Sequence, residues 1–197
     1  MIQGRNVEAE ELLNQAFEHG YSNATSSFSR LLKQKVGYSN LYGSTLRMNG
    51  KASLQIGDLN REGPHALLTT EIFGDVTGKS YLLLTPTEFD FIASRVSVPQ
   101  DMWTELKVEF IKEVDNILSA AVITRLSDRL NLCLYGDIPI LTEHREGTIE
   151  DVIFKDFAGL SEEIHVSASC FSFESQADIR PVFIWVVDGG IMKTLPG

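Results

Sequence analysis

The sequence predicts an α+β fold: one domain of two pseudo-symmetric halves around a mainly antiparallel sheet, with two long helices packed on one face. Two observations indicate this fold. First, apolar residues recur at three- and four-residue steps in two long stretches, Glu8–Lys35 and Asp101–Val122, which is typical of amphipathic helices. Second, the remaining apolar runs are short and are separated by turn-forming residues, which is typical of antiparallel strands. Because no flexible linker divides the 197 residues, we treat residues 1–197 as a single domain.

The first half is predicted to contain one long helix, a hairpin, two further strands and a short helix. After the long helix, Asn49-Gly50 indicates a tight hairpin turn, because these residues readily adopt positive φ angles. Strands are expected at His65–Phe73 and Ser80–Leu84, and the short helix is expected to begin at Pro86. The segment Gly74–Ser80 resembles a phosphate-binding loop in composition. Its glycine spacing is wrong and strands flank it on both sides, so it is predicted to be a turn.

The second half repeats the order of a long helix followed by strands. A strand is expected to run from the end of the helix into Pro139, and a helix is expected at Gly147–Phe157. Two apolar segments, Ile164–Phe173 and Pro181–Val187, are predicted to be the last strands.

A faint internal repeat relates the two halves. Shifting the first helix forward by 98 positions places Glu18 on Asn116 and Ser29 on Ser127. The halves are therefore expected to span about residues 1–98 and 99–197.

The composition excludes several classes of function. The formal net charge is −10 and no segment concentrates lysine or arginine, which argues against a nucleic-acid partner. No apolar run approaches the ~20 residues of a membrane-spanning helix, and the first residues lack a signal-peptide pattern, so we expect a cytoplasmic protein without membrane insertion. Neither the four histidines nor Cys133 and Cys170 have the spacing of metal ligands, and Cys133 is expected to be a small buried side chain.

The strongest candidate for a functional site lies on the second long helix. Its predicted apolar stripe consists of Trp103, Leu106, Phe110, Val114, Ile117 and Ala121. Glu109, Glu113 and Asn116 recur at the same steps but are rotated away from the stripe, and at about 100° per residue they fall within roughly 60° of one another. The helix is thus expected to present an acid and a carboxamide side by side to another molecule.

This helix and the segment after it resemble the CheC/CheX/FliY family of chemotaxis phosphatases. The family signature is Asp or Ser, three residues, Glu, two residues, Asn, twenty-two residues and Pro, and Glu113, Asn116 and Pro139 fit it. Two positions depart from the pattern. Glu109 stands where the family has Asp or Ser, and Asp115 is more polar than the small or apolar residue expected there.

The resemblance implies a phosphatase that hydrolyses the aspartyl-phosphate of a CheY-type response regulator. In that reaction Asn116 would orient the attacking water, Glu113 would pair with the active-site lysine of the receiver, and Pro139 would shape the strand end beside the helix. Glu109 would support the site by widening its negative patch. The chain would need no cofactor or metal of its own, because the phosphorylated receiver supplies the Mg²⁺.

The first half departs from the signature at every position. Gln15, Glu18 and Leu41 stand where the repeat places the Glu, Asn and Pro, so one active site per chain is expected. Together with the Glu109 departure, this leaves two alternatives open. The chain can be a non-catalytic CheC-like adaptor that binds a receiver or a CheD-type protein, or it can be a module associated with a flagellar switch.

Overall fold

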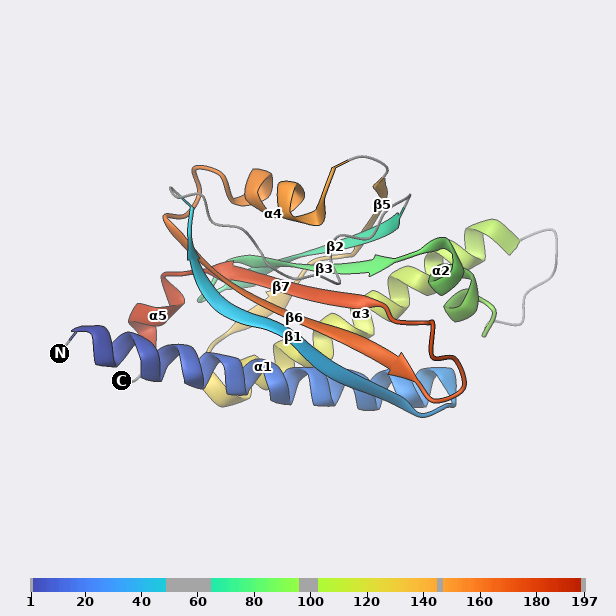
Figure 1. Cartoon of the computed structure of the whole chain (residues 1–197), viewed down its shortest axis with the longest axis horizontal. Coiled ribbons are helices and arrows are strands. Elements are labelled where there is room, and N and C mark those ends of the chain that lie inside the picture. Colours follow the sequence, from blue (N-terminus) through green and yellow to red (C-terminus); the bar gives the residue numbers. More distant parts are fainter. Residues whose placement is uncertain (1, 49–64, 96–102, 145–146, 196–197) are drawn as a thin grey trace.

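The computed structural model describes residues 2–48, 65–95, 103–144 and 147–195, with side chains described from residue 7 in the first helix and residue 105 in the second long helix. In these ranges the chain forms five helices and one seven-stranded sheet (Figure 1). The helices are α1 (Ile2–Leu32), α2 (Pro86–Ala93), α3 (Trp103–Leu130), α4 (Ile149–Phe157) and α5 (Ile191–Thr194). The strands are β1 (Val36–Arg47), β2 (His65–Gly74), β3 (Gly78–Leu84), β4 (Leu134–Gly136), β5 (Ile140–His144), β6 (Glu163–Phe173) and β7 (Val182–Asp188). The predicted α+β class is confirmed.

Most predicted elements are present, although α1 begins six residues before and α3 ends eight residues after the expected bounds, and the strand expected to run into Pro139 ends at Gly136. The two long helices are α1 and α3, and the segment predicted to be a turn joins the β2–β3 hairpin. Gly74, at the start of that turn, has φ 121°, and a Cβ there would lie 1.9 Å from the carbonyl oxygen of Cys133. Only glycine therefore fits this position without rearrangement. The predicted turn at Asn49-Gly50 lies outside the described residues.

Strand β1 is longer than the sequence indicated. Only the residues just before Asn49 were expected to be extended, whereas β1 begins at Val36 and pairs antiparallel with β6 along its whole length. The strand lies at one end of the sheet, and its register shifts between Asn40 and Tyr42. An edge strand with a bulge lacks strict alternation of apolar and polar residues, so its pattern in the sequence is weak.

The strand order supports a two-fold relation between the halves of the chain. The order is β1-β6-β7-β3-β2-β4, and β5 also pairs with β2. Strand β1 of the first half thus pairs with β6 of the second half, and β2 of the first half pairs with β4 and β5 of the second. Exchanging β1 with β4, β6 with β2 and β7 with β3 reverses this order onto itself. We propose that the domain consists of two interlocked, pseudo-symmetric halves, as the repeat of 98 residues predicts.

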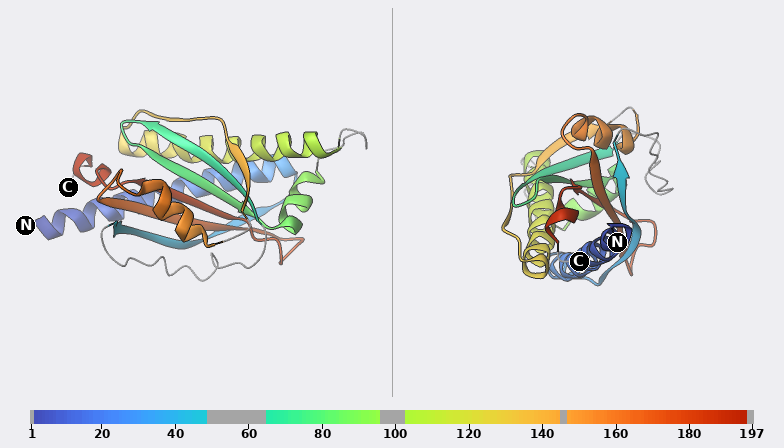
Figure 2. Two further views of the ribbon diagram at one scale, coloured as in Figure 1. Left: turned by 90° about the horizontal axis from the view of Figure 1, so that it is seen from above. Right: turned by 90° about the vertical axis from the view of Figure 1, so that its left-hand side faces the viewer.

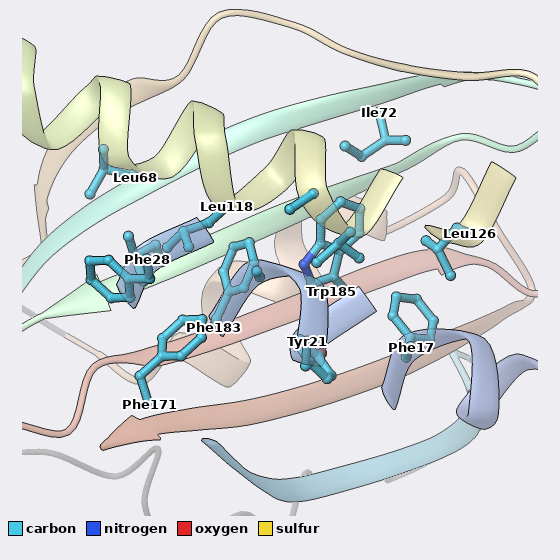
Figure 3. Packing of buried hydrophobic residues seen from close by; sticks show 14 of the residues in the cluster. Phe17, Tyr21, Phe28, Leu68, Ile72, Leu118, Leu126, Phe171, Phe183 and Trp185 are labelled. Carbon is cyan, nitrogen blue, oxygen red and sulfur yellow. The ribbon is translucent and has the colours of Figure 1, made fainter. Parts of the chain in front are cut away.

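Apolar clusters cover both faces of the sheet. The larger one lies between the sheet and helices α1 and α3, and its aromatic contacts include Phe28–Phe171 and Phe183–Trp185, with ring centroids 5.3 Å and 5.7 Å apart (Figure 3). The smaller one lies under α4, on the opposite face (Figure 2). The two long helices thus pack on one face, as predicted.

The two long helices run antiparallel and touch closely near their centres. A Cβ added at Gly20 of α1 would lie 2.9 Å from Val122 Cγ1 and 3.3 Å from Val122 Cα, so the helix backbones approach each other at this point. Beside it, Asn23 Nδ2 donates a hydrogen bond of 2.9 Å to the carbonyl oxygen of Ala121. Asn23 and Ala121 are also separated by 98 positions in the sequence, which supports the proposed two-fold relation.

Replacing Gly20 by Leu should destabilise the domain by about 1–3 kcal/mol, because the larger side chain cannot fit between α1 and Val122 without moving the helices apart. Urea denaturation measures this free energy. The matched control is Ser22→Leu, an exposed position on the same helix, which should change the free energy of unfolding by less than about 0.5 kcal/mol. Equal effects of the two substitutions would contradict the close helix contact.

Candidate functional site

Helix α3 presents Glu109, Glu113 and Asn116 on its exposed side, as the sequence predicted. The opposite side of the helix is fully buried and includes Ile111, Val114, Leu118 and Val122. Because these apolar side chains fill the core between the helices and the sheet, they determine which side of α3 faces solvent. The acid and the carboxamide are therefore held toward solvent by the packing of the helix.

The predicted apolar stripe was wrong in its phase. Of its members whose side chains are described, Val114 and Ala121 are buried, whereas Leu106, Phe110 and Ile117 are only half-buried. The buried side is rotated by about 100°, roughly one residue, from the predicted stripe. The physical reason is that α3 packs against both α1 and the sheet, so a wide arc of the helix is covered and polar residues fall within it.

A shallow depression of about 300 Å³ lies beside the exposed residues of α3. Its helix side is formed by Glu109, Lys112, Glu113 and Asn116, and its other side by the segment Gly136–Pro139. The structure thus brings the three signature residues Glu113, Asn116 and Pro139 to one place on the surface. Lys112, Asp137 and Ile138 were not predicted to line it. The sequence signal that could have identified them is that they lie next to, or two residues from, a signature residue.

The segment opposite the helix connects two short strands that both pair with β2. Gly136 of β4 pairs with Ile72, and β5 begins with the pairing of Ile140 to Thr69. Between them, the backbone N–H of Asp137 donates to the carbonyl oxygen of Glu71 at 2.9 Å. The chain then bulges away from the sheet edge at residues 137–139, where Pro139 is buried. Pro139 therefore interrupts the edge between β4 and β5 beside α3.

The exposed polar residues of α3 interact with one another along the helix. Asn116 Nδ2 donates a long hydrogen bond of 3.4 Å to Glu113 Oε2. Lys112 Nζ lies 2.8 Å from Glu109 Oε1, so this cation offsets part of the wider negative patch expected from Glu109. Exposed pairs of this kind contribute at most about 1 kcal/mol and break readily. The carboxylate and the carboxamide can therefore exchange these internal contacts for contacts with a bound molecule.

Directly before Asn116, Asp115 points into the core and is fully buried. Its Oδ2 accepts a hydrogen bond of 2.7 Å from Thr70 Oγ1 of β2, while its Oδ1 has no hydrogen-bond partner. Burial raises the pKa of Asp115 to about 7, although the hydrogen bond from Thr70 acts in the opposite direction. Asp115 is unusually polar for this position of the signature, but nothing in the sequence indicated its burial.

The histidines and cysteines form no second functional site in the part of the chain that the structure describes. Among those residues, no group of three or more His, Cys, Asp or Glu side chains is arranged to hold a metal ion. His165 is buried against Phe17, and burial lowers its pKa to about 4. Cys170 is buried, but Cys133 is exposed, so the prediction of a buried Cys133 was wrong. Within the same ranges, no helix has both the length and the apolar character to span a bilayer.

The corresponding positions of the first half form a different surface. Gln15 and Glu18 are exposed on α1, but Glu18 Oε1 accepts a hydrogen bond of 2.9 Å from Asn40 Nδ2 of β1. Leu41, at the position of the signature proline, packs against the apolar cluster under α4. This half thus offers an amide and an acid in reversed order, with the acid bonded to the domain's own strand.

Comparison with known proteins shows which solved structures have this fold. No family model and no curated protein sequence matches the chain. Among solved structures, FliY of Thermotoga maritima superposes with a TM-score of 0.66 and 15% identity, covering 94% of this chain and 92% of that one. CheX in a CheX–CheY–BeF3–Mg complex from Borrelia burgdorferi gives a TM-score of 0.52 and 16% identity over 87% and 97% of the two chains. The FliM middle domain of H. pylori gives 0.56 and 9% over 95% and 98%. The chain therefore has the fold of the CheC, CheX and FliY proteins.

Replacing Asp115 by Asn should change how stability depends on pH. A carboxyl whose pKa is raised from about 4 to about 7 in the folded state stabilises the fold fully below about pH 4, and this contribution is lost as the pH rises through 7. The variant cannot ionise at this position, so its stability relative to the parent should increase by a few kcal/mol between pH 4 and 8. Both proteins contain His165, whose own contribution cancels.

Thermal or urea unfolding of both proteins across this pH range measures the difference. Parallel stability curves would contradict the buried, neutral state of Asp115.

Proposed function

We propose that this chain is a phosphatase that hydrolyses the aspartyl-phosphate of a CheY-type response regulator in chemotaxis signalling. The observation that carries the proposal is the meeting of Glu113, Asn116 and Pro139 at one exposed depression, with the spacing of the CheC/CheX/FliY signature. The fold shared with CheX and FliY supports it, as does the CheX–CheY complex among the similar structures.

The chemistry requires only that one water molecule be held in line with the phosphorus–oxygen bond of the receiver. Water oxygen bonds to phosphorus while the bond to the aspartyl oxygen breaks, which yields a free aspartate carboxylate and inorganic phosphate, with a water proton leaving to the products. Asn116 is suited to position this water, because its carboxamide both accepts and donates hydrogen bonds without carrying a charge. Glu113 would pair with the lysine of the receiver and fix the register of the two proteins.

The metal belongs to the partner in this proposal. The receiver holds the Mg²⁺ that neutralises the charge on the phosphoryl group. The charged residues that line the depression are Lys112, Glu109 and Glu113 on α3 and Asp137 in the opposite segment, and their proposed role is recognition. Glu109 would support the site as part of its negative patch, which the ion pair with Lys112 partly offsets.

An exposed apolar side chain in the depression favours a protein as the partner. In the described part of the chain, six large hydrophobic side chains are exposed. Four of them lie on β2, β4 and β5 or in the segment between β4 and β5. They are Phe73, Tyr135, Ile138 and Ile140. Ile138 lines the depression itself and is 78% exposed. Ile138 is thus the apolar side chain that the depression offers to a protein partner.

One observation favours a second candidate function. The FliM middle domain has the same fold at a similar TM-score, so this architecture also occurs in a protein other than CheX and FliY. The alternative is therefore a non-catalytic module that binds a receiver or a CheD-type protein, or that is associated with a flagellar switch. Release of phosphate from a phosphorylated CheY-type receiver, in excess over its spontaneous loss, distinguishes the phosphatase from these alternatives.

Replacing Asn116 by Ala should reduce the rate of receiver dephosphorylation by on the order of 100-fold, because the attacking water loses its positioning group. Binding of the receiver should stay within a few-fold, since Glu113 remains. The control is the double variant Gln15→Ala/Glu18→Ala at the corresponding positions of α1, which should hydrolyse at the parental rate. Phosphate release under saturating receiver measures both. A parental rate for the Asn116 variant would exclude its proposed role.

Replacing Ile138 by Ser should weaken receiver binding by about tenfold while the rate at saturation stays unchanged, because an apolar contact at the rim of the site is lost. The matched control is Leu160→Ser, since Leu160 is 74% exposed but follows α4 on the other face of the sheet. Titration of each variant with the receiver gives the dissociation constant. Identical constants for the two variants would argue against contact at Ile138.

A further inference from the structure

A side-chain hydrogen bond connects the two sides of the candidate site beneath the surface. On the helix side, Asp115 is the residue next to Asn116, and it points inward where Asn116 points outward. On the strand side, its partner Thr70 lies in the middle of the β2 segment that holds the ends of the 137–139 bulge. The bond of 2.7 Å between Asp115 and Thr70 is therefore a direct link from α3 to β2, the strand that pairs with both ends of the bulge containing Pro139.

The neighbours of Thr70 show how directly the link reaches the bulge. Thr69 pairs with Ile140, and the carbonyl oxygen of Glu71 accepts from the Asp137 N–H. A Cβ added at Gly136 would lie 3.5 Å from Thr70 Cγ2 and 3.0 Å from Ile123 Cδ1 of α3. Gly136 thus lies against both the strand and the helix, so movement of either would displace the bulge.

Stability does not account for a carboxyl group at this position. Asp115 is fully buried and one of its oxygens has no hydrogen-bond partner, and such a group costs free energy that an apolar residue of similar size would not. Apolar contacts tolerate small rotations and shifts of a helix, whereas a hydrogen bond requires a narrower range of distances and angles. The Asp115–Thr70 pair therefore contributes a defined placement of α3 against β2.

We propose that Asp115 is a positioning residue, whose hydrogen bond to Thr70 sets the placement of Asn116 and Glu113 against the 137–139 bulge. The proposal rests on the proposed phosphatase function, because its consequence for turnover requires that Asn116 orient a water. Asp115 itself touches no reacting atom. It acts through the helix to which Asn116 belongs.

The structure contains a matched control for this link. One turn further along α3, Ser119 Oγ lies 3.1 Å from Ser80 Oγ of β3, and both side chains are buried. This pair also joins α3 to the sheet through a side-chain hydrogen bond. Strand β3 carries no part of the bulge, so loss of the Ser119–Ser80 bond should leave the site in place.

The test replaces both members of each pair by residues that cannot form the bond. Thr70→Val/Asp115→Leu should unfold at a temperature no lower than the parent, yet lower kcat at least tenfold with KM within about twofold. Ser80→Ala/Ser119→Ala should keep the parental kcat. Thr70→Ser, which keeps the hydroxyl group, should also retain it. A purely structural role for the pair predicts instead that kcat follows stability, so parental kcat in the stable Thr70→Val/Asp115→Leu variant would overturn the proposal.

Amide hydrogen exchange at Asp137 gives a second readout that does not depend on activity. Exchange should be at least several-fold faster in Thr70→Val/Asp115→Leu than in Ser80→Ala/Ser119→Ala, and if the first variant is too unstable, Thr70→Val alone takes its place. If the parent releases no phosphate from the receiver, the proposed function fails, and faster exchange still supports the link while equal exchange overturns it. If the parent is active and neither kcat nor exchange responds, only the positioning role is wrong.

Discussion

The packing of α3 between α1 and the sheet is the constraint on which the rest of the site depends. The helix is covered over a wide arc, from Ala121 on the side of α1 to the buried polar residues that contact the sheet. Close approach at Gly20 and the hydrogen bond from Asn23 fix the position of α3 along α1. Only a narrow side of the helix remains exposed near its middle, and Glu113 and Asn116 lie there because no other side is open.

The site is assembled from two segments that are held by the same strand. Helix α3 contributes the polar groups, and the bulge between β4 and β5 contributes the apolar and backbone surface opposite them. At about 300 Å³, this depression is at the lower end of the range of small-molecule pockets. It suits a reaction in which the partner already contains the activated phosphoryl group and its metal, and in which this chain adds only the alignment of a water.

Sequence patterning predicted the elements whose residues repeat with a clear period and missed those that depend on distant neighbours. Helices α1 to α4, the β2–β3 hairpin and the last strands were predicted because their apolar residues recur with a clear period, whereas the short helix α5 was not. The phase of α3 was not, because contacts with α1 and the sheet together bury polar residues on the same arc. Burial of Asp115 likewise depends on Thr70, which is 45 positions away in the sequence. Spacing within the signature did bring Glu113, Asn116 and Pro139 together.

The central claim is that a phosphorylated receiver docks with its active site over Asn116 and the bulge. The most direct test is an NMR titration of the isotope-labelled chain with a CheY-type receiver, with and without Mg²⁺ and beryllofluoride, which mimics the phosphoryl group. The account predicts shifts of the Asn116 side-chain amide and of the backbone amides of Asp137 and Ile138, larger with the activated receiver, and none at Gln15. Shifts centred on Gln15 and Glu18 of α1, with Asn116 unchanged, would contradict it.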